Sequence, residues 1–155
     1  MVRLADLPEF ERAHLRAKAM EPLGPTPFVR ADLPMNRRRV VLITTAGLHV
    51  RDDEAFELTD ASYRLIPGDL RGDELVMSHT SANFDRTGFL EDVNTVLPID
   101  RFRELADEGS LGSLASQHVS FMGAMLLPQA YEASVRHLAG LLKRDHVDTA
   151  FLTPV

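Results

Sequence analysis

The stretch Arg39-Val40-Val41-Leu42-Ile43-Thr44-Thr45 decides the fold class of this chain. It is a continuous aliphatic and β-branched run, which is typical of a strand buried on both faces of a parallel sheet. The run ends at Ala46-Gly47, and polar residues follow it. Because such a strand needs helices over both faces, the sequence predicts an α/β domain.

Further strand-like and helix-like segments alternate along the chain. The predicted strands are 74–78, 117–121 and 149–152, and the predicted helices are 4–20, 101–108 and 129–143. Phe102 and Leu105 are expected to point inward from the second helix. The polar stretch 49–71 is expected to be irregular. We therefore expect a mainly parallel sheet in a Rossmann-like or flavodoxin-like three-layer arrangement.

The sequence predicts two parts of unequal size. Residues 1–37 are expected to form a helix, with Phe10 and Leu15 at helical spacing, followed by a Pro-rich arm. Residues 38–155 are expected to form the α/β domain. The last predicted strand is expected to be buried, yet no crossover helix follows it. We therefore expect this domain to be incomplete at its C-terminus.

Composition excludes several classes of function. The 155 residues are 45% hydrophobic and 26% charged and carry a formal charge of −6, so a nucleic-acid partner is not expected. No apolar stretch approaches the roughly 20 residues of a membrane helix, and no signal pattern follows Met1, so we expect a cytoplasmic protein without a membrane partner. The chain has no cysteine, which removes disulfides, thiolate metal sites and a thiol nucleophile.

Polar residues follow each predicted strand, where ligands of parallel sheets bind. We predict one composite site from these loops. The candidate catalytic residues are His79 and His49, and the candidate substrate-binding residues are Thr44, Thr45, Gly47, Ser120, Gly123 and Asp85. Of these, His79 is the best general acid or base, because imidazole titrates near neutral pH. The two glycines allow the backbone to approach a ligand closely.

The residues alone leave the reaction open. His49, His79 and His118 could hold a metal with Asp85 or Asp53, but their wide spacing matches no compact metal motif, and no metal site is assigned. The serines and threonines lie in no nucleophile elbow, and no phosphate-binding glycine pattern is present. Hydroxyl groups that satisfy the backbone at strand ends would explain these residues equally well.

The ordered motifs resemble the selenoprotein B family of glycine, betaine, sarcosine and D-proline reductases. The similarity begins with the strand and loop Val41–His49. It continues through Phe56–Arg64, Ile66–Gly68, Ser78–Thr80, Phe84–Arg86, Glu91–Arg101, Leu105, Gly109, Gly112–Ala115, His118, Ser120–Gly123 and Leu152–Val155. It covers most of the chain from about residue 38 onward. Ala46 stands where the family pattern has a second glycine.

The resemblance implies a mechanism. Family members carry a selenocysteine, or a cysteine in its place, directly after the strand that corresponds to 150–155. The nucleophile is therefore expected just after Val155, and the present chain is expected to be inactive without it. A partner subunit's pyruvoyl group would activate the substrate, and the selenolate would attack the carbon that bears nitrogen. His49, His79 and the strand-end hydroxyls would orient the substrate or supply a proton.

The same resemblance implies the partners. They are a small amino acid or amine, other reductase subunits and thiol reductants; no cofactor is expected in this chain besides the selenocysteine of the full-length protein. Independently of the resemblance, we expect a homo-oligomer. Two alternatives stay open. The chain could be a non-catalytic interaction module whose final strand pairs with another chain. It could also be a cysteine-free enzyme that depends on its histidines.

Overall fold

The computed structural model describes residues 3–17, 24–25, 29–81, 84, 86–124 and 126–155, which fall into two compact units, 1–31 and 32–155. In the first unit, α1 (Glu9–Ala17) confirms part of the predicted helix. Its apolar side chains are exposed, with Phe10 72% accessible. The remainder of the predicted helix and part of the predicted Pro-rich arm, at 18–23 and 26–28, lie outside the described residues.

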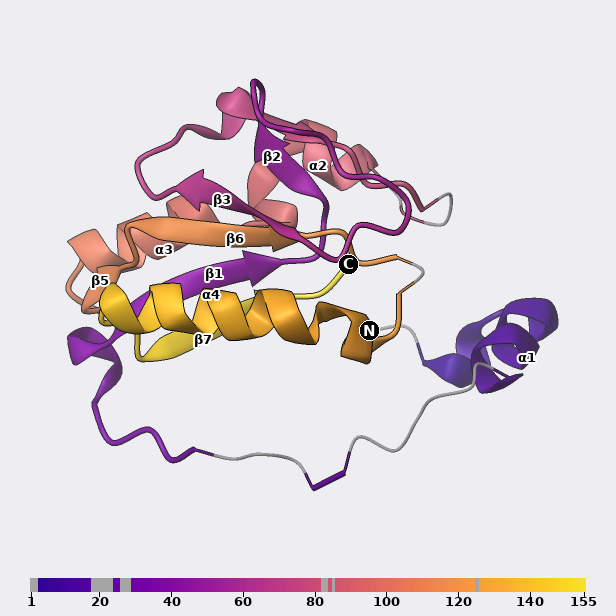
Figure 1. The fold of residues 1–155 in the computed structure, drawn as a ribbon, viewed down its shortest axis with the longest axis horizontal. Coiled ribbons are helices and arrows are strands. Elements are labelled where there is room, and N and C mark those ends of the chain that lie inside the picture. The colour runs from indigo at the N-terminus through magenta and orange to yellow at the C-terminus, as the bar shows by residue number, and fades with distance from the viewer. Residues whose placement is uncertain (1–2, 18–23, 26–28, 82–83, 85, 125) are drawn as a thin grey trace. The chain divides into compact units, whose positions relative to one another are not determined.

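The second unit is built around β1 (Arg39–Thr44), the strand predicted from the aliphatic run 39–45. β7 (Thr149–Thr153) pairs with one edge of β1 along its length, in parallel. The other edge is shared by β5 (Ser113–Leu114) near the start of β1 and β6 (Gln117–Phe121) near its end, both also parallel. β3 (Tyr63–Pro67) pairs with β6 in the antiparallel direction. The predicted, mainly parallel sheet is confirmed (Figure 1).

Side chains of β1 alternate between two apolar clusters on opposite faces of the sheet. Val40 and Leu42 belong to one cluster, and Val41 to the other. The first cluster includes residues of α3 (Ile99–Asp107), β2 (Leu48–Val50) and β4 (Leu75–Met77). The second includes Leu138 of α4 (Glu132–Arg144). Figure 1 shows α4 on one face of the sheet and α3 on the other, which confirms the three-layer α/β arrangement.

The remaining elements are short. They are α2 (Thr87–Glu91) and the 3-10 helices Leu4–Asp6, Met35–Arg37, Gly72–Glu74, Val93–Thr95 and Pro128–Tyr131. α3 and α4 begin and end within three residues of the predicted helices 101–108 and 129–143. Among the described residues, no helix has both the length and the apolar character that crossing a membrane requires.

Several expectations about single segments are wrong. The stretch 49–71 contains most of β2 and all of β3, which pattern analysis missed because the charged Arg64 interrupts β3. β4, within predicted strand 74–78, pairs antiparallel with β2 outside the main sheet. β7, expected to be buried, leaves Leu152 66% exposed. Leu105, expected to point inward, is 40% exposed, whereas Phe102 packs on Phe151 with ring centroids 4.8 Å apart.

The side chain of His118 accepts a hydrogen bond from β1 between the segments of β1 that pair with β5 and β6. β5 and β6 pair with β1 at residues 39–40 and 43–44, and the peptide N–H of Leu42, between these pairings, donates to Nδ1 of His118 at 3.2 Å. The His118 side chain is fully buried. Burial, reinforced by the positive charge of Arg103, lowers the pKa of His118 from 6.5 to about 4.

We predict that the burial of His118 lowers the free energy of unfolding of the chain in acid. The unfolded chain binds a proton as the pH falls through 6.5, whereas the folded chain keeps His118 neutral until about pH 4. The contribution of neutral His118 to the free energy of unfolding is therefore complete above pH 6.5. It is lost as the pH falls toward 4, by a total of about 3 kcal/mol. His118→Asn can still accept from Leu42 but does not titrate. Urea unfolding should therefore show a smaller acid-induced loss for this variant than for wild type. An equal loss in both proteins would contradict the assignment.

Candidate functional site

The loops that follow β1 and β6 meet at one edge of the sheet. Thr44 and Ser120 are register partners in β1 and β6, so both strands end side by side. Just beyond them, the N–H of Gly123 donates to the carbonyl of Thr45 at 3.0 Å. A Cβ on Gly123 would lie 2.6 Å from Cβ of Thr45, so this close approach requires glycine. The structure thus brings together four of the predicted substrate-binding residues.

The end of β7 joins the same edge. The N–H of Val155 donates to Oγ1 of Thr45 at 2.9 Å, and the N–H of Thr45 donates to the carbonyl of Thr153 at 3.2 Å. In Figure 1 the C-terminal label accordingly lies beside the carboxyl end of β1. Residues 153–155 therefore lie against the loop that carries Thr45.

Gly47 brings the loop after β4 to this edge. Its carbonyl accepts from the N–H of Ser78 at 2.9 Å, and its φ of 64° lies in the left-handed region. A Cβ at Gly47 would lie 3.0 Å from the backbone nitrogen of His79. Both the backbone conformation and this contact favour glycine. The predicted composite of strand-end loops therefore includes His79. Asp85, also predicted for the site, lies outside the described residues.

The hydroxyl groups at the strand ends accept hydrogen bonds from backbone N–H groups. Oγ1 of Thr44 accepts from the N–H of Ala46 at 3.2 Å, and Oγ of Ser120 accepts from the N–H of Leu48 at 2.7 Å. Both side chains are completely buried. These hydrogen bonds satisfy peptide groups that the sheet leaves unpaired where its strands end.

His79 presents a hydrogen-bond donor. Its Nδ1 accepts from the N–H of Ser81 at 3.2 Å, so the neutral ring carries its proton on Nε2. The ring packs on Phe84 with centroids 4.7 Å apart, and the residue is only 5% exposed. Burial lowers the pKa of His79, and the charge of Arg86 lowers it further. His79 therefore favours the neutral form more strongly than an exposed histidine does.

His49 offers a hydrogen-bond acceptor instead of a donor. Its Nδ1 lies 2.8 Å from the carbonyl of Val50, which can only accept, so Nδ1 carries the proton and Nε2 keeps its lone pair. Nε2 of both His49 and His79 is buried without a hydrogen-bond partner among the described residues. The two histidines thus offer one unused donor and one unused acceptor.

Several grooves lie away from the two histidines. One of about 610 Å³ is lined by residues that include Arg71, Leu90 and Arg103, and one of about 320 Å³ lies beside Arg64. Neither is lined by His49 or His79, whose Nε2 atoms are buried among the described residues. Within the described ranges, which omit Asp85, no group of three or more histidine and carboxylate side chains is placed to hold a metal ion.

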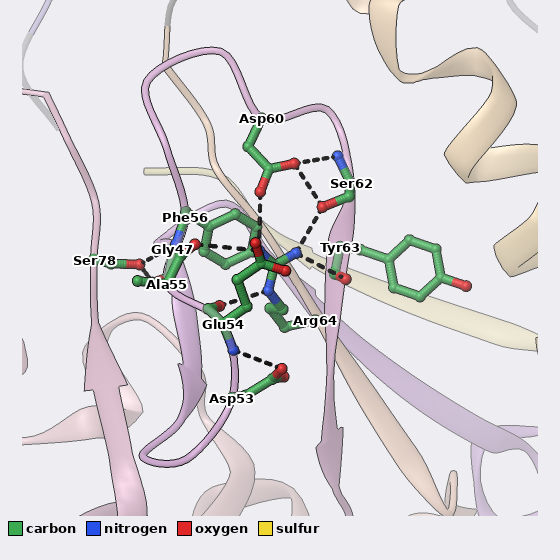
Figure 2. A network of polar contacts seen from close by, with 10 residues as sticks. All are labelled: Gly47, Asp53, Glu54, Ala55, Phe56, Asp60, Ser62, Tyr63, Arg64 and Ser78. Atoms are coloured by element: carbon green, nitrogen blue, oxygen red, sulfur yellow. Dashed lines mark hydrogen bonds and ion pairs between the residues drawn. The ribbon is translucent and has the colours of Figure 1, made fainter.

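Sequence analysis missed Arg64, the centre of the polar network in Figure 2. Arg64 is a register partner of Ser120 and is 8% exposed. Its guanidinium donates to the carbonyl of Glu54 at 2.7 Å and pairs with Asp60 at 2.9 Å. An arginine inside a strand that is otherwise apolar was the signal that could have revealed it, because buried arginines are almost always paired.

A pair of glycines tests the packing of this site. Gly47 and Gly109 both have positive φ, but a Cβ at Gly109 would meet nothing within 4 Å. Gly109→Ala should cost about 1–2 kcal/mol of unfolding free energy from backbone strain alone. Gly47→Ala should cost about 1–3 kcal/mol more, because its Cβ also presses on His79. Urea unfolding of both variants measures the difference, and equal losses would show that the contact of Gly47 with His79 is unimportant.

Comparison with known proteins agrees with the resemblance seen in the motifs. The family model for glycine/sarcosine/betaine reductase selenoprotein B (GRDB) matches residues 30–155. The chain is 32% identical over 142 residues to the D-proline reductase subunit gamma of Acetoanaerobium sticklandii. This match covers 90% of the chain but 58% of the relative, so the chain spans little more than half of that protein. No solved structure matches the chain. The chain belongs to the glycine/sarcosine/betaine reductase selenoprotein B family.

Proposed function

We propose that this chain provides the strand-end scaffold of a reductase that cleaves the C–N bond of a small amino acid or amine. Candidate substrates are D-proline, glycine, sarcosine and betaine. The observation that carries the proposal is the convergence of loops 44–49, 78–80, 120–123 and 153–155 at one edge of the sheet. These loops contain motifs by which the sequence resembles the family, and they come from four separate parts of the chain.

The nucleophile is proposed to come from outside these 155 residues. The chain contains no cysteine, so it has neither a thiol nor a selenol of its own. A selenol suits the attack because it is ionised near neutral pH and is strongly nucleophilic. The hydrogen bond between Val155 and Thr45 supports a position just after Val155, since a residue there would emerge at the strand-end loops.

The two histidines are proposed to bind the substrate. The Nε2–H of His79 can donate to a carboxylate, and Nε2 of His49 can accept from an amine N–H. Glycine, sarcosine and D-proline offer both groups, whereas betaine has a carboxylate but no N–H and would use His79 alone. Because both nitrogens are enclosed, the proposal requires that they become accessible when substrate binds. The overall reaction breaks one C–N bond and forms one C–H and one N–H bond, with two electrons and two protons from a dithiol.

Partners follow from the same proposal. A relative named as a subunit supports other reductase subunits as partners of this chain. Thiol reductants would supply the electrons. Self-association and a cytoplasmic location stay predictions.

The assembled reductase from the native host tests the proposed function. With a dithiol present, it should release the C–N cleavage product of at least one of D-proline, glycine, sarcosine and betaine. His79→Phe keeps a planar ring but removes the donor, so it should lower kcat/KM by about tenfold or more, which is the loss of one hydrogen bond to a charged group. His14→Phe, a change at an exposed histidine of α1, is the matched control and should leave the rate unchanged.

Two results would contradict this function. One is an assembled reductase that cleaves none of these substrates with a dithiol. The other is C–N cleavage by residues 1–155 alone, since these residues contain no thiol or selenol.

A further inference from the structure

We propose that Arg64 is a positioning residue for the site: it fixes the loop 54–62, which in turn holds His79 through Phe56 and Ser78. The functional meaning of this inference rests on the proposed function, because His79 matters only if it binds substrate. The geometric part stands on the contacts of Arg64 alone.

Arg64 binds its loop from inside. Its guanidinium donates to the carbonyls of Glu54 at 2.7 Å and Ala55 at 3.3 Å, and to the hydroxyl of Ser62 at 2.6 Å. It also pairs with the carboxylate of Asp60 at 2.9 Å. The planar fork of arginine can reach these four partners at once, whereas the point charge of lysine cannot. Both ends of the loop are therefore attached to one side chain of β3 (Figure 2).

Asp60 balances the charge of Arg64. Burial alone would raise the pKa of Asp60, but hydrogen bonds from Ser62 and Arg64 outweigh it, and the pKa is lowered. The carboxylate therefore stays ionised beside the guanidinium. Removing one partner of a buried ion pair is strongly destabilising, because it leaves the other charge uncompensated. The pair of Asp60 with Arg64 therefore favours one arrangement of the network.

The loop then holds Ser78. The guanidinium of Arg64 lies over the ring of Phe56, 4.3 Å from its centroid. The backbone N–H of Phe56 donates to Oγ of Ser78 at 2.8 Å, and this hydroxyl lies 3.4 Å from the carbonyl of Gly47, to which it donates. Figure 2 shows this succession from Arg64 to Ser78. Ser78 is thus fixed from two sides, by the loop after β2 and by the loop after β1.

His79 follows Ser78 directly in the chain and lies so close to Gly47 that a Cβ there would come within 3.0 Å of the His79 backbone nitrogen. A shift of Ser78 therefore moves His79 out of its buried position. We call the contacts from Arg64 through Phe56 to Ser78 the path. Removing the path's contacts at Arg64 or at Ser78 should have the same effect on the position of the His79 ring. A purely structural role for Arg64 would change stability without this shared effect on His79.

The test follows the His79 imidazole by NMR during a pH titration of residues 1–155. Arg64→Lys and Ser78→Ala should each raise the pKa of His79 toward its ordinary value, because loosening the loop admits water to a ring whose pKa is lowered mainly by burial. The double variant should show the shift of the larger single variant and not the sum, since both changes cut one path. Arg71→Lys is the matched control, because the exposed pair of Arg71 with Asp73 has no part in the path.

Two outcomes would overturn the inference. One is a folded Arg64→Lys or Ser78→Ala variant in which the pKa of His79 is unchanged. The other is a double variant in which the two shifts add in full. If Arg64→Lys does not fold, Asp60→Asn decides in its place, since it weakens the hold of Arg64 on the loop while Arg64 and Ser78 are both retained. The titration needs no enzymatic activity, so failure of the proposed function would leave this result intact.

Discussion

β1 is buried on both faces and paired on both edges, and this double constraint decides where the other strands and helices of the α/β unit can lie. Val40, Val41 and Leu42 are at most 1% exposed, and each contributes about 1.5–3 kcal/mol of hydrophobic stabilisation. Their alternating side chains require an apolar layer on each face, which α3 and α4 supply. Three parallel partners, β5, β6 and β7, then fix which chain segments end beside the carboxyl end of β1.

The same constraint creates the candidate site. Where a doubly buried strand ends, its peptide groups are still shielded from water and need partners. Thr44 and Ser120 supply them with hydroxyls, and the glycines allow the loops to close on one another. The interactions that terminate the sheet thus also enclose His49 and His79 with one unused donor and one unused acceptor. Stability and site geometry therefore depend on the same few contacts.

The parts that sequence analysis predicted are those set by local apolar pattern. The strands 39–45 and 149–152 were predicted because their aliphatic and aromatic residues favour a strand whatever surrounds them. Arg64 and β3 were missed because the charge of Arg64 is compensated by Asp60 and by backbone carbonyls. These contacts form only in the folded chain and leave no trace in the apolar pattern of the sequence. The exposure of Leu152 was missed for a similar reason: its hydrophobicity does not reveal that β7 has a partner on one side only among the described strands. The tautomers of the histidines depend on single hydrogen bonds and have no sequence signature.

We propose that these 155 residues form the scaffold of a reductase site whose nucleophile lies just after Val155. The intact mass and selenium content of the protein purified from its native host test this proposal. We expect a mass clearly above 17.3 kDa with selenium present. A selenium-free protein of 17.3 kDa would contradict it, because no residue of that chain could attack the carbon that bears nitrogen as a selenol or thiol does.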